Sequence, residues 1–116
     1  MEVSLDETMR LVIGSWKWVE SAGGIALIKI TPETENKSKL IVFQSDQSYL
    51  EYINQSLVFK NKFTIRMKKT IFSEELLPVL EIPSRMDQVI YFEDKNTLYL
   101  KDNVHDGFDH KFIREK

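Results

Sequence analysis

The sequence predicts an all-β protein, an antiparallel up-and-down β-barrel of about eight strands preceded by a short helical lead-in. Short segments rich in β-branched and aromatic residues follow one another along the 116-residue chain, with turn-forming residues between them. No helical pattern is long enough to connect parallel strands. One long segment alternates apolar and polar residues, as a strand with one buried face does. The length suits one domain, which we expect to span residues 1–116.

The expected helical lead-in is SLDETMRLVIG, residues 4–14. Ser4 and Glu7 have the spacing of a capping box, in which each side chain caps the other's backbone N–H. Gly14 would stop the helix before the first strand. The expected strands that follow are residues 15–21, 24–31, 38–44, 47–53, 56–69, 87–93, 97–101 and 108–114.

The alternation is clearest in SLVFKNKFTIRMKK, residues 56–69, where lysine, arginine and threonine separate apolar residues. We expect one strand, bent near Asn61, with its odd-numbered side chains inside. The apolar odd-numbered residues are Leu57, Phe59, Phe63, Ile65 and Met67. The segment FSEELLPVLEI interrupts the strand pattern, because Ser73 can cap a helical turn that Pro78 would end. We interpret this segment as a loop lid or a plug at the barrel end.

Composition excludes several function classes. The net charge of −2 offers no concentrated basic surface, so we expect no nucleic-acid partner and no direct binding to anionic membranes. The absence of cysteine excludes disulfides, thiol catalysis and Cys-ligated zinc. No nucleophile elbow, zinc-protease motif or phosphate-binding glycine loop is present, so we expect neither enzymatic activity nor a cofactor. MEVSLDETMR lacks the pattern of a signal peptide.

Both tryptophans of the chain lie in IGSWKW, residues 13–18. Side chains alternate along a strand, so Trp16 and Trp18 should point to the same face, and Glu20 should share it. Gly14 lets the backbone pass closely where the chain enters this strand. Two inward indoles would fill much of the interior, and each needs an acceptor for its N–H group.

GSWKW resembles the G-x-W signature in the first strand of lipocalins and related calycin barrels. Together with GSWKWVESAGGIA…TPET, LIVFQSDQSYLEY and TLYLKDNVHDGFDHKFIR, it is similar to a small lipocalin-like group of exported lipoproteins in Gram-negative bacteria. The resemblance implies that Gly14, Trp16 and Arg114 form a structural closure, with Arg114 of the last strand packed on Trp16. It also implies export to the periplasm or cell surface, with a lipid anchor upstream as the link to a membrane. If Met1 is the native start, the chain is cytoplasmic.

The leading functional hypothesis is non-catalytic binding of a small, mostly apolar molecule in the barrel mouth. Strand parity gives the expected ligand-binding set: Trp18, Glu20, Phe59, Phe63, Met67, His110 and Phe112. Glu20 and His110 would orient the ligand. The alternative is a protein-interaction or inhibitor module that uses the barrel loops, because a short eight-stranded barrel can be filled by its own side chains.

Two further readings involve the C-terminal third. His110 could serve a haem protein or a barrel enzyme, but we favour a hydrogen-bonded core or rim histidine, since one histidine makes no closed metal site. Asp102, Asn103, Asp106 and Asp109 could offer oxygens to calcium, but they lack the spacing of the 12-residue calcium loop. We expect no metal, and interpret Asp106-Gly107 as a tight turn with positive φ at Gly107.

Overall fold

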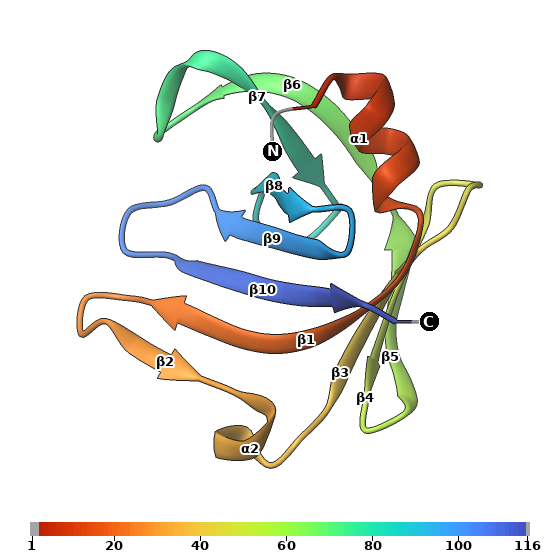
Figure 1. Cartoon of the computed structure of the whole chain (residues 1–116), viewed down its shortest axis with the longest axis vertical. Coiled ribbons are helices and arrows are strands. Elements are labelled where there is room, and N and C mark those ends of the chain that lie inside the picture. Colours follow the sequence, from red (N-terminus) through yellow and green to blue (C-terminus); the bar gives the residue numbers. More distant parts are fainter. Residues whose placement is uncertain (1–2, 116) are drawn as a thin grey trace.

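The computed structural model describes residues 3–115 and consists of one large antiparallel sheet with a short N-terminal helix (Figure 1). The predicted all-β class is confirmed, but the sheet has ten strands rather than about eight. Its order is β5-β4-β3-β1-β10-β9-β8-β7-β6, and β2 pairs with β1. The elements are α1 (Leu5–Val12), β1 (Gly14–Gly23), β2 (Ile28–Ile30), α2 (Pro32–Glu35), β3 (Lys39–Phe43), β4 (Ser48–Ile53), β5 (Ser56–Lys62), β6 (Thr64–Thr70), β7 (Ser73–Glu81), β8 (Gln88–Asp94), β9 (Thr97–Asp102) and β10 (Phe108–Arg114).

The N-terminal helix forms where the capping signal predicts it. The backbone N–H of Glu7 donates to Oγ of Ser4 over 3.2 Å, which caps the first turn of α1. The helix ends at Val12, and Gly14 begins β1 with a φ of +133°. Apolar side chains of α1 pack against the core of the sheet. The helix therefore covers the interior at the end where β1 starts (Figure 1).

The sheet curves strongly, and its two end strands are consecutive in the chain (Figure 1). Residues 56–69 form two strands rather than the single predicted one, because β5 ends at Lys62 and β6 begins at Thr64. Phe63, at the corner, is buried; β5 pairs with β4 and β6 pairs with β7. The pairings within residues 3–115 include no β5–β6 ladder, so the two strands are joined only through this corner.

The inward assignment of the odd-numbered residues in this segment is partly correct. Phe63 and Ile65 are buried in the core, and Phe59 packs against it. Leu57 is exposed, as is its neighbour Val58, so alternation fails at the start of β5. A bulge between Glu51 and Tyr52 shifts the register with β4 at that point, which accounts for the loss of parity.

The predicted helical turn at Ser73 is wrong. Residues Ser73–Glu81 form β7, which pairs with β6 along its length but with β8 only at Val79 and Leu80. Pro78 lacks an N–H donor, and it sits opposite Met67 of β6 just outside the short ladder to β8. Backbone pairing with β6 therefore overrides the local capping signal.

Two connections also differ from the expected strands. The strand expected over residues 24–31 is confined to β2, Ile28–Ile30. Thr31 then caps the short helix α2 through a capping box with Thr34. Pro32 occupies the first helical turn, where its missing N–H costs no helical hydrogen bond.

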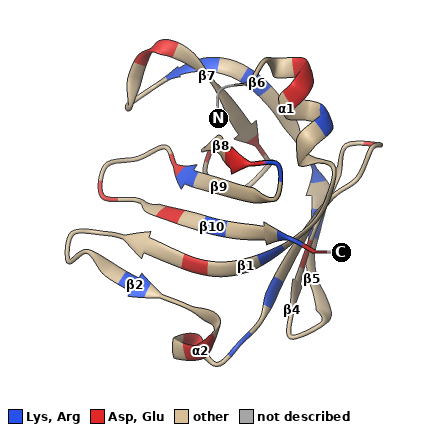
Figure 2. Cartoon of the chain, in the orientation of Figure 1, with Lys and Arg blue, Asp and Glu red and all other residues tan. Residues whose placement is uncertain are grey.

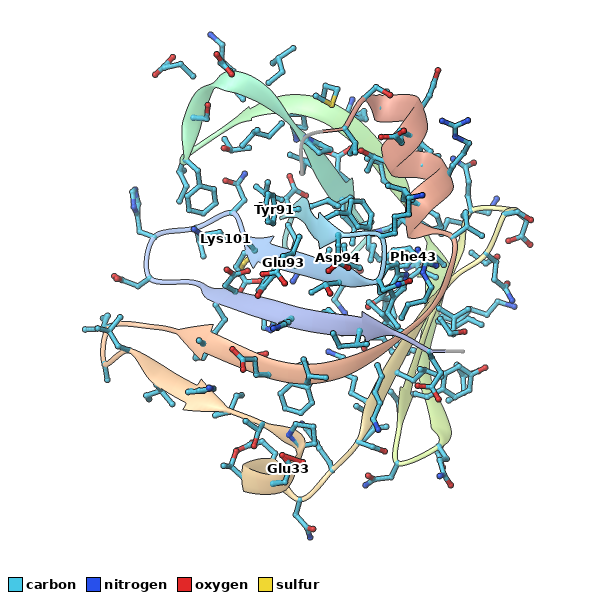
Figure 3. All side chains as sticks on the ribbon, viewed as in Figure 1. Glu33, Phe43, Tyr91, Glu93, Asp94 and Lys101 are labelled. Carbon is cyan, nitrogen blue, oxygen red and sulfur yellow. The ribbon has the colours of Figure 1, made fainter. Side chains whose placement is uncertain are left out.

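The inner face of the curved sheet is packed most tightly near α1. Trp16, Phe43, Phe92 and Leu98 are fully or almost fully buried there. Phe43 lies close to the point where α1 passes into β1 (Figure 3). Further along the strands the buried layer contains Trp18, Ile41, Phe63, Ile90 and Phe112.

Charged residues are distributed over the whole fold. Figure 2 shows acidic and basic positions on α1 and spread over the strands, with only acidic positions on α2. In α1 the order follows the helix dipole, with Asp6 and Glu7 in the first turn and Arg10 in the last. Among residues 3–115, no helix has the length and apolarity to cross a membrane.

Candidate functional site

Polar and charged side chains gather on the inner face at the end of the sheet away from α1. These side chains come from β3, β4, β8, β9 and β10 and from the connection between β7 and β8. This inner polar cluster consists of Lys39, Glu51, Arg85, Gln88, Asp102 and His110. It surrounds a cavity of about 240 Å³, whose other walls are Tyr49, Ile82, Met86, Leu100 and Phe112.

Glu51 is the buried centre of one half of the inner polar cluster. Arg85 donates to both of its carboxylate oxygens, over 2.8 and 3.1 Å, and the Tyr49 hydroxyl donates over 2.5 Å. Burial acts to raise the pKa of Glu51, but the hydrogen bonds from Arg85 and Tyr49 outweigh it and hold the pKa below its usual value. Glu51 is therefore ionised, and both of its carboxylate oxygens accept hydrogen bonds from these two side chains.

Arg85 reaches this carboxylate from the connection between β7 and β8. Its backbone N–H donates to Ile82 O over 3.0 Å, and Ser84 has a φ of +69°, which fixes a tight turn. The Arg85 guanidinium lies 3.8 Å from the centre of the Phe59 ring. Stacking and the two hydrogen bonds together hold the turn across the mouth of the cavity.

Asp102 and His110 form the other half. Nε2 of His110 lies 3.2 Å from Oδ1 of Asp102, and Gln88 donates to the same oxygen over 2.9 Å. The backbone N–H of Phe108 donates to the second carboxylate oxygen over 3.0 Å. Burial acts to raise the pKa of Asp102, but these hydrogen bonds outweigh it and lower the pKa to about 2.

His110 is also linked to the tryptophan of β1. Nε1 of Trp18 donates to Oγ of Ser21 over 2.8 Å, and that oxygen lies 2.6 Å from Nδ1 of His110. An ionised Asp102 carboxylate can only accept, which favours the tautomer with the proton on Nε2; in that tautomer Nδ1 accepts from the Ser21 hydroxyl. The chain Trp18–Ser21–His110–Asp102 fixes the orientation of the imidazole.

The prediction that Glu20 shares the inner face of Trp16 and Trp18 is wrong. A bulge in the pairing of β1 with β10 falls between Trp18 and Glu20, so Ser21 becomes the inward residue. Glu20 instead pairs with Lys29 of β2 over 3.4 Å. No feature of the sequence marks this bulge, and it decides which polar side chain reaches His110.

The other predicted site residues are distributed over three places. His110 and Phe112 line the cavity. Trp18 and Phe63 are buried in the packed layer beneath it, and Phe59 supports Arg85 at the rim. Met67 lines a different hollow, beside Val3 and Pro78, where β7 separates from β8.

Sequence reasoning missed most of the polar walls. Lys39 and Glu51 follow period two with the inward residues Ile41 and Tyr49, so parity could have placed them inside. Arg85 reaches the cavity from a turn, where no periodicity applies. The sequence suggests Asp102 only as a possible calcium ligand, whereas its carboxylate accepts hydrogen bonds from protein donors.

The closure residues meet as the resemblance implies. The Arg114 guanidinium lies 4.2 Å from the centre of the Trp16 ring system, so the expected contact is confirmed. Arg114 also donates to the carbonyl oxygens of Leu11, Ile13 and Lys95 over 2.7–3.2 Å. Nε1 of Trp16 donates to Val12 O over 2.8 Å, so the two side chains satisfy the carbonyls at the end of α1.

Gly14 belongs to the same cluster. A Cβ there would lie 2.9 Å from the Arg114 guanidinium, and its φ of +133° is one that other residues rarely adopt. The turn near the other end of β10 differs from the prediction, since Asp106 rather than Gly107 has positive φ. Gly107 is instead required for close approach, as a Cβ would lie 2.7 Å from Asp102 Cβ.

No family model, no curated protein and no solved structure matches this chain. The observations therefore establish a small all-β protein built on one antiparallel sheet, with a charged cavity on its inner face. Within residues 3–115, no group of three or more His, Asp or Glu side chains is arranged to hold a metal ion.

Proposed function

We propose that the chain is a lipocalin-like barrel that binds a small molecule, without catalysis, in the cavity at its open end. The observation that carries this proposal is the cavity of about 240 Å³ surrounded by polar and charged side chains from five strands and one turn. Closure of the sheet is supported by its curvature and by the corner at Phe63, which joins its two end strands. The lipocalin-like assignment is supported by the stacking of Arg114 on Trp16 beside Gly14.

The walls favour an amphipathic ligand over the mostly apolar one expected from strand parity. Ile82, Leu100 and Phe112 offer apolar contact, and the inner polar cluster offers hydrogen bonds in the same cavity. A purely apolar ligand would remove water from the charged groups without replacing its hydrogen bonds, which is unfavourable. A ligand with an apolar body and one polar group satisfies both kinds of wall.

Binding rather than catalysis is supported by the state of Ser21. The hydroxyl lies next to His110, which resembles part of a nucleophile arrangement. However, Ser21 is only 2% exposed, and its oxygen already accepts from Trp18. A nucleophile needs an accessible oxygen, so the geometry favours a structural role for this chain of hydrogen bonds.

A loop-mediated interaction module is the second candidate. Ile25 and Leu27, in the connection between β1 and β2, are 86% and 85% exposed. Large exposed apolar side chains are common at protein–protein contacts. The charged cavity favours the first function, because a filled interior was the feature expected of an interaction module.

Ligand-detected NMR with a library of small amphipathic molecules tests the proposal. Compounds that bind should shift the backbone amide signals of Lys39, Gln88 and His110. Leu100→Phe adds volume to the cavity wall and should weaken binding at least about tenfold, or about 1.4 kcal/mol. The matched change Leu57→Phe lies on an exposed residue and should leave binding unchanged. Compounds that bind equally to both variants and shift residues 24–28 would instead support the interaction module.

A further inference from the structure

Lys39 differs from the other charged residues of the cavity in its lack of an ion-pair partner among the described residues. It lies at the start of β3, on the inner side with Ile41, and is partly buried. Among residues 3–115, no carboxylate oxygen lies within 4.0 Å of its ammonium, and the ammonium donates no hydrogen bond. Three N–H donors are therefore available at the cavity wall.

The carboxylates of Glu51 and Asp102, in contrast to Lys39, have hydrogen-bond partners within the protein. Both oxygens of Glu51 accept hydrogen bonds from protein donors. Both oxygens of Asp102 do so as well. Among the described residues of the cavity, Lys39 is therefore the cation without a carboxylate partner, so a ligand gains most by bringing an acceptor to Lys39.

The environment of Lys39 adds to the preference for an anion. Burial lowers the pKa of Lys39, and the negative charge of Glu51 only partly opposes that. A half-buried ammonium that has lost water without gaining a partner is destabilised, and a ligand anion would relieve this. Lys39 lines the same cavity as the apolar side chains of Leu100 and Phe112, which suits a molecule with an apolar body and one anionic group.

A single negative charge fits better than two. One unpaired cation can balance one anion, whereas a dianion such as phosphate would also be repelled by Glu51 and Asp102. The apolar walls further favour an organic acid over an inorganic ion. On the basis of the proposed function, we infer that the cavity binds a small organic monocarboxylate whose carboxylate pairs with Nζ of Lys39.

Benzoate and benzamide form a matched pair of probes, because they have almost the same shape and differ in charge. Amide NMR titrations at pH 7 measure the Kd of each. We expect benzoate to bind more tightly than benzamide. Lys39→Met should weaken benzoate at least about tenfold, the range for a charged hydrogen bond, and change benzamide by less than about threefold. Lys62→Met removes an exposed lysine and should change neither Kd.

The outcomes separate the inference from the proposed function. Equal Kd values for the two probes, or equal losses with Lys39→Met, would overturn the inference while leaving a ligand cavity in place. Absence of saturable binding by both probes would overturn the proposed function for molecules of this size, and the inference with it. Lys39→Gln is the second variant if Lys39→Met fails to fold, and it should produce the same selective loss.

Discussion

Replacing Arg114 with alanine should destabilise the protein substantially without changing its secondary structure. The guanidinium bridges three parts of the chain: Leu11 and Ile13 at the end of α1, the turn at Lys95, and the Trp16 ring. Alanine would leave two partly buried carbonyls without their charged donor and would expose one face of the indole.

The size of the effect follows from these contacts. Hydrogen bonds to a charged donor are worth about 1.5 kcal/mol each at the low end of the measured range. The stack on the indole is worth about 1 kcal/mol. Counting the two partly buried carbonyls of Leu11 and Ile13 but not the exposed one of Lys95, the loss is about 4 kcal/mol. For a chain of this length, this lowers Tm by about 15 °C.

Urea unfolding followed by circular dichroism measures this loss, with thermal unfolding as a second measurement. The midpoint should fall for Arg114→Ala while the m value is unchanged. Arg114→Lys keeps the charge but has no planar fork, so it should recover less than half of the loss. Lys17→Ala, at an exposed position of the same sheet region, should change stability by less than about 0.5 kcal/mol. A loss below about 1 kcal/mol for Arg114→Ala, or full recovery by lysine, would refute the reasoning.

Three further changes test the corner, the close approach and the charged end. Phe63→Ala should lower the free energy of unfolding, measured in urea, by about 3–5 kcal/mol because the ring is buried. Lys62→Ala, at an exposed position, should be nearly neutral. Equal effects of the two changes would contradict the burial argument. Gly14→Ala should lower the free energy of unfolding by about 2 kcal/mol, through backbone strain and contact with Arg114. The loss should be smaller in an Arg114→Ala background. Additive losses in the double variant would argue against the contact. The pKa of Asp102 is lowered from 3.8 to about 2, so its ionised form stabilises the folded state by about 2 kcal/mol above pH ~4. This stabilisation is lost as the pH falls towards 2. Asp102→Asn should remove this part of the acid dependence, measured by urea unfolding across that pH range.

The fold class could be predicted because its signals are local. Alternation and turn residues identify most of the strands, and Ser4 marks the start of α1. The segment beginning at Ser73 shows the limit of local signals. Its capping residue and leucines are compatible with a helical turn, but pairing with β6 made it a strand. The choice depended on a partner that local propensity does not describe.

The site was less predictable because small irregularities decide it. Because of one bulge, Ser21 rather than Glu20 lies on the inner face. The residues of β1 after the bulge therefore face the side of the sheet opposite to the one that simple alternation predicts. Lys39 and Glu51 do follow period two, but charged residues at such positions are typical of a solvent-exposed face, so their type points away from the interior. Arg85 depends on how its turn folds across the cavity, which follows from its contacts with Glu51 and Phe59.

The contrast between the two ends of the inner face supports the proposal that a ligand binds at the charged end. Near α1, Trp16 and Phe92 fill the space, and Arg114 closes it through contacts that stabilise the fold. At the other end, Glu51 and Asp102 are withdrawn from water, and a buried ion pair is often no more stabilising than well-packed apolar residues of similar volume. Stability alone therefore gives no reason for an ionised carboxylate beside an unpaired Lys39. A ligand that completes this charge arrangement does, and it would stabilise the folded chain in proportion to its own affinity.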